Sequence, residues 1–435
     1  MSRIVVLGGG IAGLSTAYFL AKAGMKPIVL EKEKEAGGLG FCHSVGDMFI
    51  DSGYHIIFKG DEYLLNLLRE LNLEKDIVWG DLDFKLVTKK GDIFFSPLKI
   101  LSSICLSLSE KKFLAKIYFK MKNTKDWKSL DKFTAKEWII KNSSGDVYKD
   151  IFEPIIKAKW GRDSDKASAA WFYGRLKPRS KSRNIFGGGE KAGYLKGSFK
   201  NLFSVLEREI KGRGGEIITS AKPTRISIKN KKVVSVKYRI NKNLKEMRTD
   251  TLISTIPVGE LLRIAKLPED FERQARKLKY KAVICAVFSL RKKVTNSFRT
   301  IFSERRSFGG LVELTNLIDK KHFGGKHILY VFNFLNAEES LWKLGDKEII
   351  ERYMNDLERL YSSFKEQIIW YRLYKNQYGE PFYQKDYLNI MPDTKTPVKG
   401  LFLTGMIHSY PVSDFNNIVS LASKTADLVL REVRC

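Results

Sequence analysis

The stretch IVVLGGGIAGLSTAYFLAKAG at residues 4–24 decides the fold of this 435-residue chain. It opens with a short, fully apolar run at residues 4–7, which is typical of a strand inside a parallel sheet. Gly8, Gly10 and Gly13 then give the spacing GxGxxG, and a helix-forming segment follows over residues 14–23. The pattern predicts a strand, a tight turn and a helix whose N-terminus can hold a phosphate group.

Each of the three glycines has its own task in such a turn. Gly8 permits the tight turn itself, and Gly10 lets a pyrophosphate approach the backbone. Gly13 lets the helix pack closely against the strand. Ala17 keeps the packed helix face small, and Gly24 ends the helix at a position where a left-handed residue is wanted.

A carboxylate follows at the position that a dinucleotide site needs. We expect a second strand over residues 26–30, which delivers Glu31 at its carboxyl end, about 20 residues beyond the glycines. There a carboxylate accepts hydrogen bonds from the adenosine ribose. These features predict a dinucleotide-binding site, and they suit NAD and FAD equally.

The segment after Glu31 favours FAD over NAD. Lys32 is followed by the glycine pair Gly37 and Gly38, and then by the turn-rich segment DSGYH at residues 51–55. Such a segment can lay its backbone against a second part of a ligand. In a simple dehydrogenase this stretch would usually run into another helix.

This pattern resembles the flavin amine oxidase superfamily, especially its protoporphyrinogen oxidase, phytoene desaturase and UDP-galactopyranose mutase branches. The resemblance covers nearly the whole chain, with the specific motifs at its two ends. It implies FAD as the cofactor and an α/β fold, in which a Rossmann-type FAD-binding domain carries a discontinuous α+β substrate domain. We expect the FAD-binding domain at residues 1–60, 190–265 and 385–435, and the substrate domain at residues 61–189 and 266–384.

The resemblance also implies a second half of the flavin site near the C-terminus. An apolar strand ends at Gly405, and a loop leads to a helix that begins near Asn417, with Asp414 or Asn416 as its N-cap. The positive end of this helix would stabilise the negative charge of a reduced flavin. The expected cofactor-binding residues are Gly8, Gly10, Ile11, Ala12, Gly13, Glu31, Lys32, Gly38, Leu39, Gly53, Tyr54, His55, Pro223, Gly405, Met406, Asn417 and Ile418.

Three of these positions depart from the family's pattern. Leu39 stands where an arginine is usual, and Met406 stands where an acidic residue is common. Pro223 is the nearest match to a position whose backbone N–H holds the adenine, and proline has no N–H. Either the register there is shifted by one residue or one contact is missing.

His55 and Tyr410 are the predicted catalytic residues. His55 lies in the turn that relatives place at the flavin, and a histidine titrates near neutrality, so it can accept a proton. It can equally serve only to hydrogen-bond the flavin or the backbone. Tyr54, His408 and Tyr410 are candidate walls of the same pocket, with ordinary aromatic packing as the alternative.

The reaction that the resemblance implies is the transfer of a hydride to flavin N5 from a C–C or C–N bond of an apolar or amphiphilic substrate. Amine oxidases place a flavin-facing lysine on a strand near residues 282–287, and Cys285 with apolar neighbours stands there instead. This absence argues against amine oxidation. A redox-neutral nucleotide-sugar mutase and a non-catalytic flavoprotein are the alternatives.

The middle of the chain carries weaker signals. We expect helices over residues 61–190, an amphipathic helix over residues 194–211, and longer alternating strands over residues 266–384. The segment at residues 160–175 contains Trp160 and Trp171 and resembles a helical stretch of the substrate domain in protoporphyrinogen oxidase relatives. These two tryptophans can either contact the substrate directly or form a buried pair in a helix core, and the sequence does not decide between the two roles.

The chain carries a formal net charge of +28, because 77 basic residues outnumber 49 acidic ones. Because the lysines are dispersed along the chain, three explanations of this charge remain open: a general enrichment in lysine, attraction to a membrane surface, and an anionic ligand. Nucleic acid is the least favoured partner. Residues 98–121 suit either a membrane interface or a core helix with a solvated lysine face.

We expect a cytoplasmic protein with a small-molecule substrate. The chain shows neither a secretory signal nor a spanning segment. Its four cysteines form no CxxC pair, which predicts three packed thiols, a free terminal one at Cys435, and no bound metal. The sequence does not decide the oligomeric state.

Overall fold

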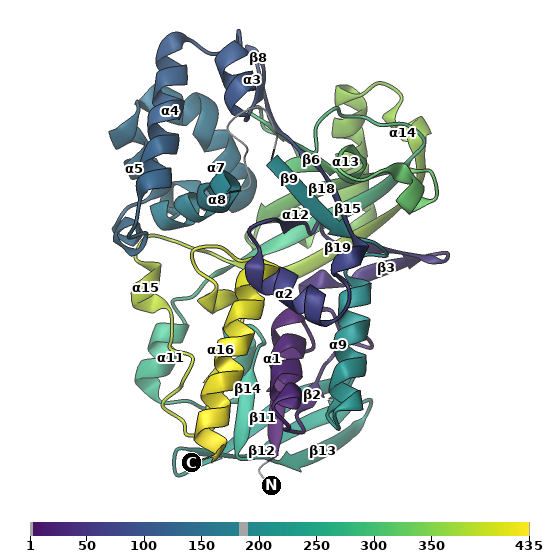
Figure 1. The fold of residues 1–435 in the computed structure, drawn as a ribbon, viewed down its shortest axis with the longest axis vertical. Coiled ribbons are helices and arrows are strands. Elements are labelled where there is room, and N and C mark those ends of the chain that lie inside the picture. Colours follow the sequence, from purple (N-terminus) through teal and green to yellow (C-terminus); the bar gives the residue numbers. More distant parts are fainter. Residues whose placement is uncertain (1–2, 182–189, 435) are drawn as a thin grey trace.

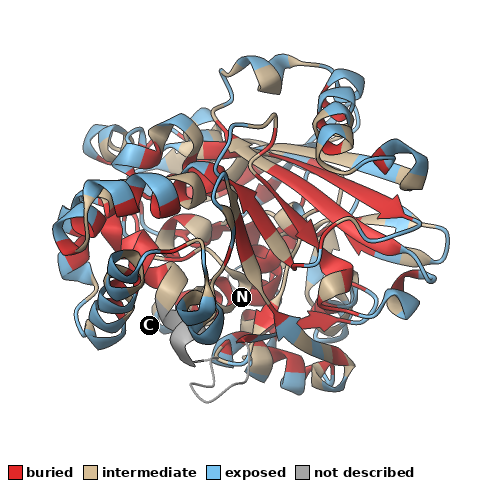
Figure 2. Ribbon diagram, turned by 90° about the horizontal axis from the view of Figure 1, so that it is seen from above, coloured by how far each residue is buried: buried red, intermediate tan, exposed pale blue. Residues whose placement is uncertain are grey.

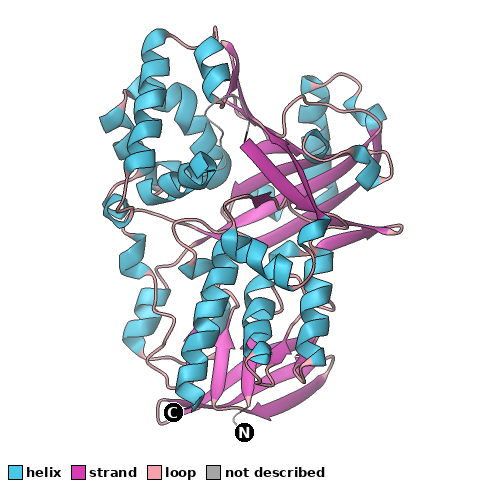
Figure 3. Ribbon diagram, in the orientation of Figure 1, coloured by secondary structure: helices cyan, strands magenta, loops and turns pink. Residues whose placement is uncertain are grey.

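The computed structural model describes residues 3–181 and 190–434, and Cys435 lies outside the described residues. Figure 1 shows an elongated molecule in which both chain ends lie at the bottom. A parallel sheet with helices occupies the lower half, while a helical region and a large mixed sheet occupy the upper half (Figures 1 and 3).

A five-stranded parallel sheet forms the centre of the lower half, with the strand order β10-β2-β1-β14-β20. Its strands are β1 (Ile4–Leu7), β2 (Ile28–Leu30), β10 (Glu216–Ile218), β14 (Thr251–Ser254) and β20 (Leu401–Leu403). The helices packed along one face are α1 (Ile11–Lys22), α9 (Lys200–Gly212) and α16 (Phe415–Arg434). On β1, Ile4 and Val6 join the core beneath these helices, whereas Val5 and Leu7 join the core on the opposite face. The continuous apolar run therefore reflects burial on both faces, as predicted.

A smaller antiparallel sheet covers the second face of the parallel sheet. It consists of β11 (Ala221–Lys229), β12 (Lys232–Ile240) and β13 (Asn243–Arg248). Ala221, Ile226 and Val236 of this sheet share the core with Val5 and Leu7. The short helices α10 (Val258–Ile264) and α11 (Glu269–Ala275) follow β14 and lead the chain into the upper half.

A seven-stranded mixed sheet dominates the upper half, with the order β19-β15-β18-β17-β16-β7-β8. Its strands are β7 (Phe84–Thr88), β8 (Gly91–Phe94), β15 (Tyr280–Leu290), β16 (Arg299–Phe302), β17 (Gly310–Glu313), β18 (His327–Leu335) and β19 (Ile368–Pro381). The view from above shows most of these strands as buried (Figure 2). The elements α12 (Ser340–Lys343), α13 (Asp346–Leu360) and α14 (Phe364–Gln367) lie on the outer side. Ile284 and Phe288 of β15 pack against α13, so the alternate side chains Val283 and Cys285 face the other way.

A helical layer stands on that other side, at the upper left of Figure 1. It consists of α3 (Pro97–Ser102), α4 (Leu108–Asn123), α5 (Ala135–Asn142), α6 (Gly145–Val147), α7 (Glu153–Trp160) and α8 (Ala169–Lys181). Capping boxes begin two of these helices, at Ser107 with Glu110 and at Thr134 with Glu137. The remaining elements are the hairpin β3 (Cys42–Val45) and β4 (Met48–Asp51), the helices α2 (Glu62–Glu70) and α15 (Tyr387–Ile390), and the sheet of β5 (Ile57–Phe58), β9 (Glu190–Leu195) and β6 (Ile77–Leu82).

Two local predictions were wrong. Residues 77–94 form the strands β6, β7 and β8 rather than helices, because β6 pairs with β9 and β7 pairs with β16, which are both distant in the sequence. The helix expected over residues 194–211 begins only at Lys200. Tyr194 and Leu195 belong to β9, and the positive φ of Gly197 (73°) and Ser198 (70°) turns the chain before the helix can start.

The parallel sheet draws its strands from the three segments assigned to the FAD-binding domain, and the seven-stranded sheet draws its strands from the other two segments. The sheet β5-β9-β6 combines strands of both sets. The division into two domains therefore stays a prediction. The prediction that a residue with a left-handed backbone conformation ends α1 is confirmed, because Gly24 has a φ of 88°.

Candidate functional site

A cavity of about 1790 Å³ is lined by residues of both halves. Pockets for single small molecules usually hold about 300–1,000 Å³, so this cavity has room for a dinucleotide and a second ligand. Fourteen of the predicted cofactor-binding residues line it: Gly8, Gly10, Ile11, Ala12, Glu31, Lys32, Gly38, Leu39, Gly53, Tyr54, His55, Pro223, Met406 and Ile418. The structure thus brings the two ends of the chain together at one site.

The glycine loop has the geometry that its spacing predicts. Gly8 has a φ of 100°, which an L side chain rarely adopts. A Cβ atom at Gly13 would lie 1.9 Å from the carbonyl oxygen of Gly8, so only glycine fits where α1 crosses the end of β1. Gly13 does not line the cavity, and its role is to bring the helix N-terminus up to it.

The glycine pair folds directly onto this loop. The backbone N–H of Gly37 donates to the carbonyl oxygen of Gly9 at 2.9 Å. A Cβ atom at Gly38 would lie 3.0 Å from the Cα of Gly10, which is tighter than a normal contact. The next residue, Leu39, lines the cavity and offers its carbonyl oxygen to the ring of His55 at 3.2 Å. The pair therefore lays backbone, rather than side chains, along this wall.

Glu31 is held in place by two backbone groups. Its Oε2 accepts a hydrogen bond from the N–H of Gly9 at 2.5 Å, and its Oε1 accepts one from the N–H of Glu33 at 2.8 Å. Each carboxylate oxygen can accept a further bond. The side chain is buried at the carboxyl end of β2 and lines the cavity, beside Lys32.

The loop before the last helix completes this side of the cavity. Asp414 is the N-cap of α16, because its Oδ1 accepts a hydrogen bond from the N–H of Asn417 at 2.8 Å. Asn416 instead caps α2, accepting from the N–H groups of Tyr63 and Leu64 at 2.9 and 3.1 Å. Met406 and Ile418 face the cavity. The prediction of Asp414 or Asn416 as cap is confirmed for Asp414.

Two predicted contact residues of this segment lie behind the cavity wall. Asn417 donates its side-chain N–H to the carbonyl oxygen of Val412 at 3.0 Å, which ties the loop to the helix. Gly405, with a φ of 121°, approaches Ala12, since a Cβ atom there would lie 3.6 Å from the Cβ of Ala12. Neither residue lines the cavity. Lys222 lines it beside Pro223, so the shifted register and the missing contact both stay open.

His55 stands between the glycine-pair wall and α16. Its ring stacks on Phe415 with the centroids 4.5 Å apart and meets the edge of Phe199. Burial lowers the pKa of His55, against a weaker opposing effect of Asp51, so the ring is neutral at pH 7. Since the carbonyl oxygen of Leu39 can only accept, Nε2 carries the proton and Nδ1 is left as an acceptor.

A charged cluster that the sequence did not reveal also lines the cavity. Lys159 and Arg175 both pair with the buried carboxylate of Glu380. Burial lowers the pKa of Lys159 to about 8. Arg299 also lines the cavity, and the cluster gathers side chains from α7, α8, β16 and β19.

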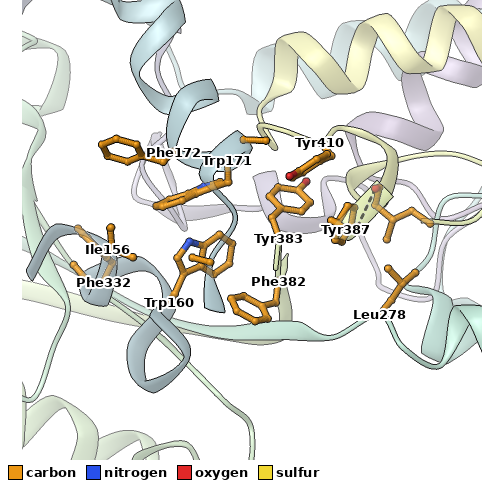
Figure 4. Packing of buried hydrophobic residues seen from close by; sticks show 14 of the residues in the cluster. Ile156, Trp160, Trp171, Phe172, Leu278, Phe332, Phe382, Tyr383, Tyr387 and Tyr410 are labelled. Carbon is orange, nitrogen blue, oxygen red and sulfur yellow. Dashed lines mark hydrogen bonds between the residues drawn. The ribbon is translucent and has the colours of Figure 1, made fainter. Parts of the chain in front are cut away.

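Some aromatic residues near the site line the cavity and others lie in the core behind it; Figure 4 shows how Trp160, Trp171 and Phe172 pack together. Trp171 lines the cavity, while Trp160 is fully buried behind it, with the ring centroids 5.1 Å apart. Tyr54 lines the cavity and packs against Phe332. His408 does not line it, because its Nε2 bonds the carbonyl oxygen of Pro392 at 2.9 Å.

Tyr410 does not face the cavity either. Its hydroxyl donates to the buried carboxylate of Asp131 and lies 2.5 Å from the hydroxyl of Ser168. Its ring packs against Tyr383 and Tyr387 (Figure 4). Burial, together with Asp131, raises the pKa of the hydroxyl, so it stays protonated. The predicted catalytic role of Tyr410 has no support in this geometry, which gives it a structural one.

The Tyr410→Phe variant should therefore lose stability and keep its activity. Removing the hydroxyl takes a hydrogen bond from the buried Asp131, which costs about 1–3 kcal/mol. We expect a lower midpoint of urea unfolding and an unchanged rate of flavin reduction in the folded protein. A fall in that rate of about tenfold or more at full flavin content would restore Tyr410 to the chemistry.

A glycine loop on a parallel sheet and the capped start of a C-terminal helix, both at one large and mostly apolar cavity, define a dinucleotide-binding oxidoreductase. The chain belongs to the flavin-containing amine oxidoreductase family, whose model matches residues 11–430. It is a flavin-dependent oxidoreductase.

Three individual proteins illustrate what this chain is similar to. The chain is 24% identical to 15-cis-phytoene desaturase of Synechococcus elongatus over 445 residues, covering 93% of this chain and 90% of the relative. A solved structure from Exiguobacterium sp. 255-15, provisionally assigned as a protoporphyrinogen oxidase, has a TM-score of 0.76 at 16% identity and covers 99% of both chains. Reduced UDP-galactopyranose mutase also reaches a TM-score of 0.76 at 16% identity, over 99% of this chain and 96% of the mutase. These two solved structures show the fold.

Within the residues that the structure describes, no helix has both the length and the apolar character to cross a membrane.

Proposed function

We propose that the flavin is FAD and that the protein takes a hydride from a C–C or C–N bond of an apolar or amphiphilic substrate. The observation that carries the proposal is one continuous cavity that joins the glycine loop to a chamber of aromatic and aliphatic side chains. Bound flavin supplies the electron sink that accepts the hydride at N5. The chain supplies binding, orientation and a dry chamber.

The residues at the site suit a dinucleotide rather than a mononucleotide. The N-terminus of α1, reached over Gly8 and Gly10, would hold a pyrophosphate through its free N–H groups. Glu31 would accept hydrogen bonds from the adenosine ribose. The N-terminus of α16, beside Met406 and Ile418, would lie against the flavin ring and favour its reduced, negative form.

The absorption spectrum of the purified protein tests this proposal first. We expect the bands of an oxidised flavin, release of FAD rather than FMN on denaturation, and bleaching under anaerobic conditions by an apolar or amphiphilic reductant. A colourless protein that cannot be reconstituted with FAD would overturn the proposal.

His55 is the proposed proton acceptor of the reaction, with simple hydrogen bonding as the alternative. Its neutral Nδ1 can take a proton while Nε2 stays bound to Leu39. We expect the rate of flavin reduction to fall as the pH drops through a pKa below 6.5, since the acceptor is then protonated. His55→Gln should lower the plateau rate by about 10²-fold or more and remove this acidic limb.

The control for this experiment is His322→Gln, which alters a histidine outside the cavity. A His55→Gln protein that keeps its flavin, its rate and its acidic limb would leave His55 with a hydrogen-bonding role alone.

A redox-neutral mutase is the second candidate, because cationic side chains gather in the cavity at Lys159, Arg175 and Arg299. Such a cluster could accept a nucleotide diphosphate. Anaerobic mixing with UDP-sugars separates the candidates. Turnover of the sugar that requires dithionite-reduced protein supports the mutase, whereas turnover that requires an electron acceptor supports the oxidoreductase.

We further propose that the surface around α3 rests on a membrane. Leu98, Leu101, Ile104 and Leu108 are 63–98% exposed, and no residue of α3 is buried. Exposed lysines of α4 stand beside them, and the inner face of α4 lines the cavity. This surface at the top of Figure 1 would take apolar side chains into an anionic lipid layer and bring the cavity close to a lipid-soluble substrate.

The double variant Leu101→Ser with Ile104→Ser should lose membrane binding. Each apolar side chain contributes about 1.5–3 kcal/mol when it leaves water, so the bound fraction should fall at least about tenfold. The measurement is flotation at low salt with phosphatidylcholine vesicles that contain about one third phosphatidylglycerol. Leu244→Ser is the matched control, because Leu244 is 57% exposed at the opposite end of the molecule, on β13 (Figure 1). Absence of flotation in the wild type would contradict the proposal.

A further inference from the structure

Arg299 is a cation inside the cavity without an acidic partner. It opens β16, and its guanidinium carbon lies 5.2 Å from the ring centre of Phe332, 5.8 Å from that of Phe84 and 5.9 Å from that of Tyr54. Its Nε is buried and has no hydrogen-bond partner. Within residues 3–181 and 190–434, no carboxylate forms an ion pair with it.

The acidic side chain closest to Arg299 along the paired strand is already engaged. Asp83 precedes β7, and the N–H of Arg299 reaches only its backbone oxygen, at 3.2 Å. The carboxylate of Asp83 accepts instead from the hydroxyl of Ser297 at 2.9 Å and from the N–H of Phe298 at 2.7 Å. Ring contacts are thus what holds the Arg299 side chain.

The neighbouring charges do not balance Arg299 either. Glu380 serves both Lys159 and Arg175, and the positive charges of Arg175 and Arg299 help to keep the pKa of Lys159 low, after burial. Asp414 is the other acid near Arg175, and burial raises its pKa to about 6. In this part of the cavity the three cations Lys159, Arg175 and Arg299 outnumber the two carboxylates, and the half-buried guanidinium of Arg299 is left without a counter-charge of its own, which is costly where access to water is reduced.

We propose that Arg299 binds an acidic group, a carboxylate or a phosphate, at the end of an otherwise apolar substrate. A guanidinium presents its N–H groups as a planar fork that matches either acid with two parallel hydrogen bonds. The surrounding rings exclude water and receive the apolar body. This inference rests on the proposed function, because it names the substrate class of the same cavity: an amphiphile with one anionic end.

Calorimetric titration with three probes that share a naphthalene ring tests the proposal. The probes are 2-naphthoate, 2-naphthyl phosphate and the neutral 2-naphthalenemethanol. We expect the wild type to bind at least one of the anions about tenfold more tightly than the alcohol. The stronger of the two anions identifies the acid. In Arg299→Gln this preference should disappear, while the affinity for the alcohol stays within about twofold.

Two further variants keep the test decisive. Arg299→Lys retains the charge without the fork and should keep part of the preference. Arg305→Gln removes an exposed arginine just after β16 and should keep all of it. If Arg299→Gln fails to fold, the test uses Arg299→Lys instead. A preference for the anions that is undiminished in Arg299→Lys would overturn recognition by two parallel hydrogen bonds from the guanidinium. A wild type without preference, or a preference that survives Arg299→Gln, overturns the proposal.

The outcome is separable from that of the proposed function. Flavin content and flavin reduction decide whether the protein is an FAD-dependent oxidoreductase, whereas the probe titration reads binding alone. A flavin-loaded protein without anion preference would discard the Arg299 site and leave the oxidoreductase intact.

Discussion

We expect Gly10→Ala to give a folded protein with less than about a tenth of the wild-type flavin content. A Cβ atom at Gly10 would lie 3.7 Å from the Cα of Gly38, which is ordinary van der Waals contact, so the folded chain can accommodate the methyl group. The same methyl group would stand where a pyrophosphate must approach the backbone. The measurement is the ratio of flavin to protein absorbance after reconstitution, together with the thermal unfolding midpoint.

Gly13→Ala, in the same loop, should fail in a different way. Its Cβ atom would lie 1.9 Å from the carbonyl oxygen of Gly8, and the backbone there cannot move without separating α1 from β1. We expect a loss of about 3 kcal/mol or more in the free energy of unfolding, with the flavin loss as a consequence. Gly60→Ala is the control, since nothing lies within 4 Å of a Cβ atom there. Full flavin content in Gly10→Ala would show that the phosphates bind elsewhere.

The parts of the site that the sequence predicts are those in which the signal is local. The turn between β1 and α1 and the carboxylate at the end of β2 lie within about 30 residues, so residue order alone determines their geometry. The N-cap at Asp414 is equally local. Their convergence on one cavity follows from the parallel sheet, in which strand ends meet at one edge.

The parts that the sequence missed depend on distant partners. Residues 77–94 lie inside the region that was expected to be helical, and pairing with the distant strands β9 and β16 makes them strands. Lys159 shares the helix α7 with Lys157, and nothing in the local sequence distinguishes the buried Lys159 from the exposed Lys157. Its partner Glu380 is more than 200 residues away, and no local pattern joins the two. Tyr410 was misplaced because a conspicuous loop tyrosine can point to either side of a cavity wall.

The Glu380→Gln variant should be the most strongly destabilised of the charge variants. Glu380 is 5% exposed and is the shared partner of Lys159 and Arg175. Removing the charge from one side of a buried pair leaves uncompensated cations, which typically costs about 3–5 kcal/mol. We expect a large fall in the urea midpoint at pH 7. Glu338→Gln, at an exposed pair with Arg162, should change it by less than about 0.5 kcal/mol.

The pH dependence of this loss of stability distinguishes the effect of Glu380 on Lys159 from other effects of the substitution. The pKa of Lys159 is about 8 in the folded protein and 10.5 when unperturbed, so the unfolded chain binds more protons between these values and this group makes stability rise with pH there. Without Glu380 the folded pKa falls further, and the window in which protonation opposes folding extends to lower pH. The Lys159 contribution to the difference between variant and wild type should therefore be largest at pH 7 and below, and should vanish as the pH rises past about 8, because Lys159 is then neutral in both folded proteins. A cost that stays the same on both sides of pH 8 would mean that Glu380 acts through its pair with Arg175 or through packing, rather than by neutralising Lys159.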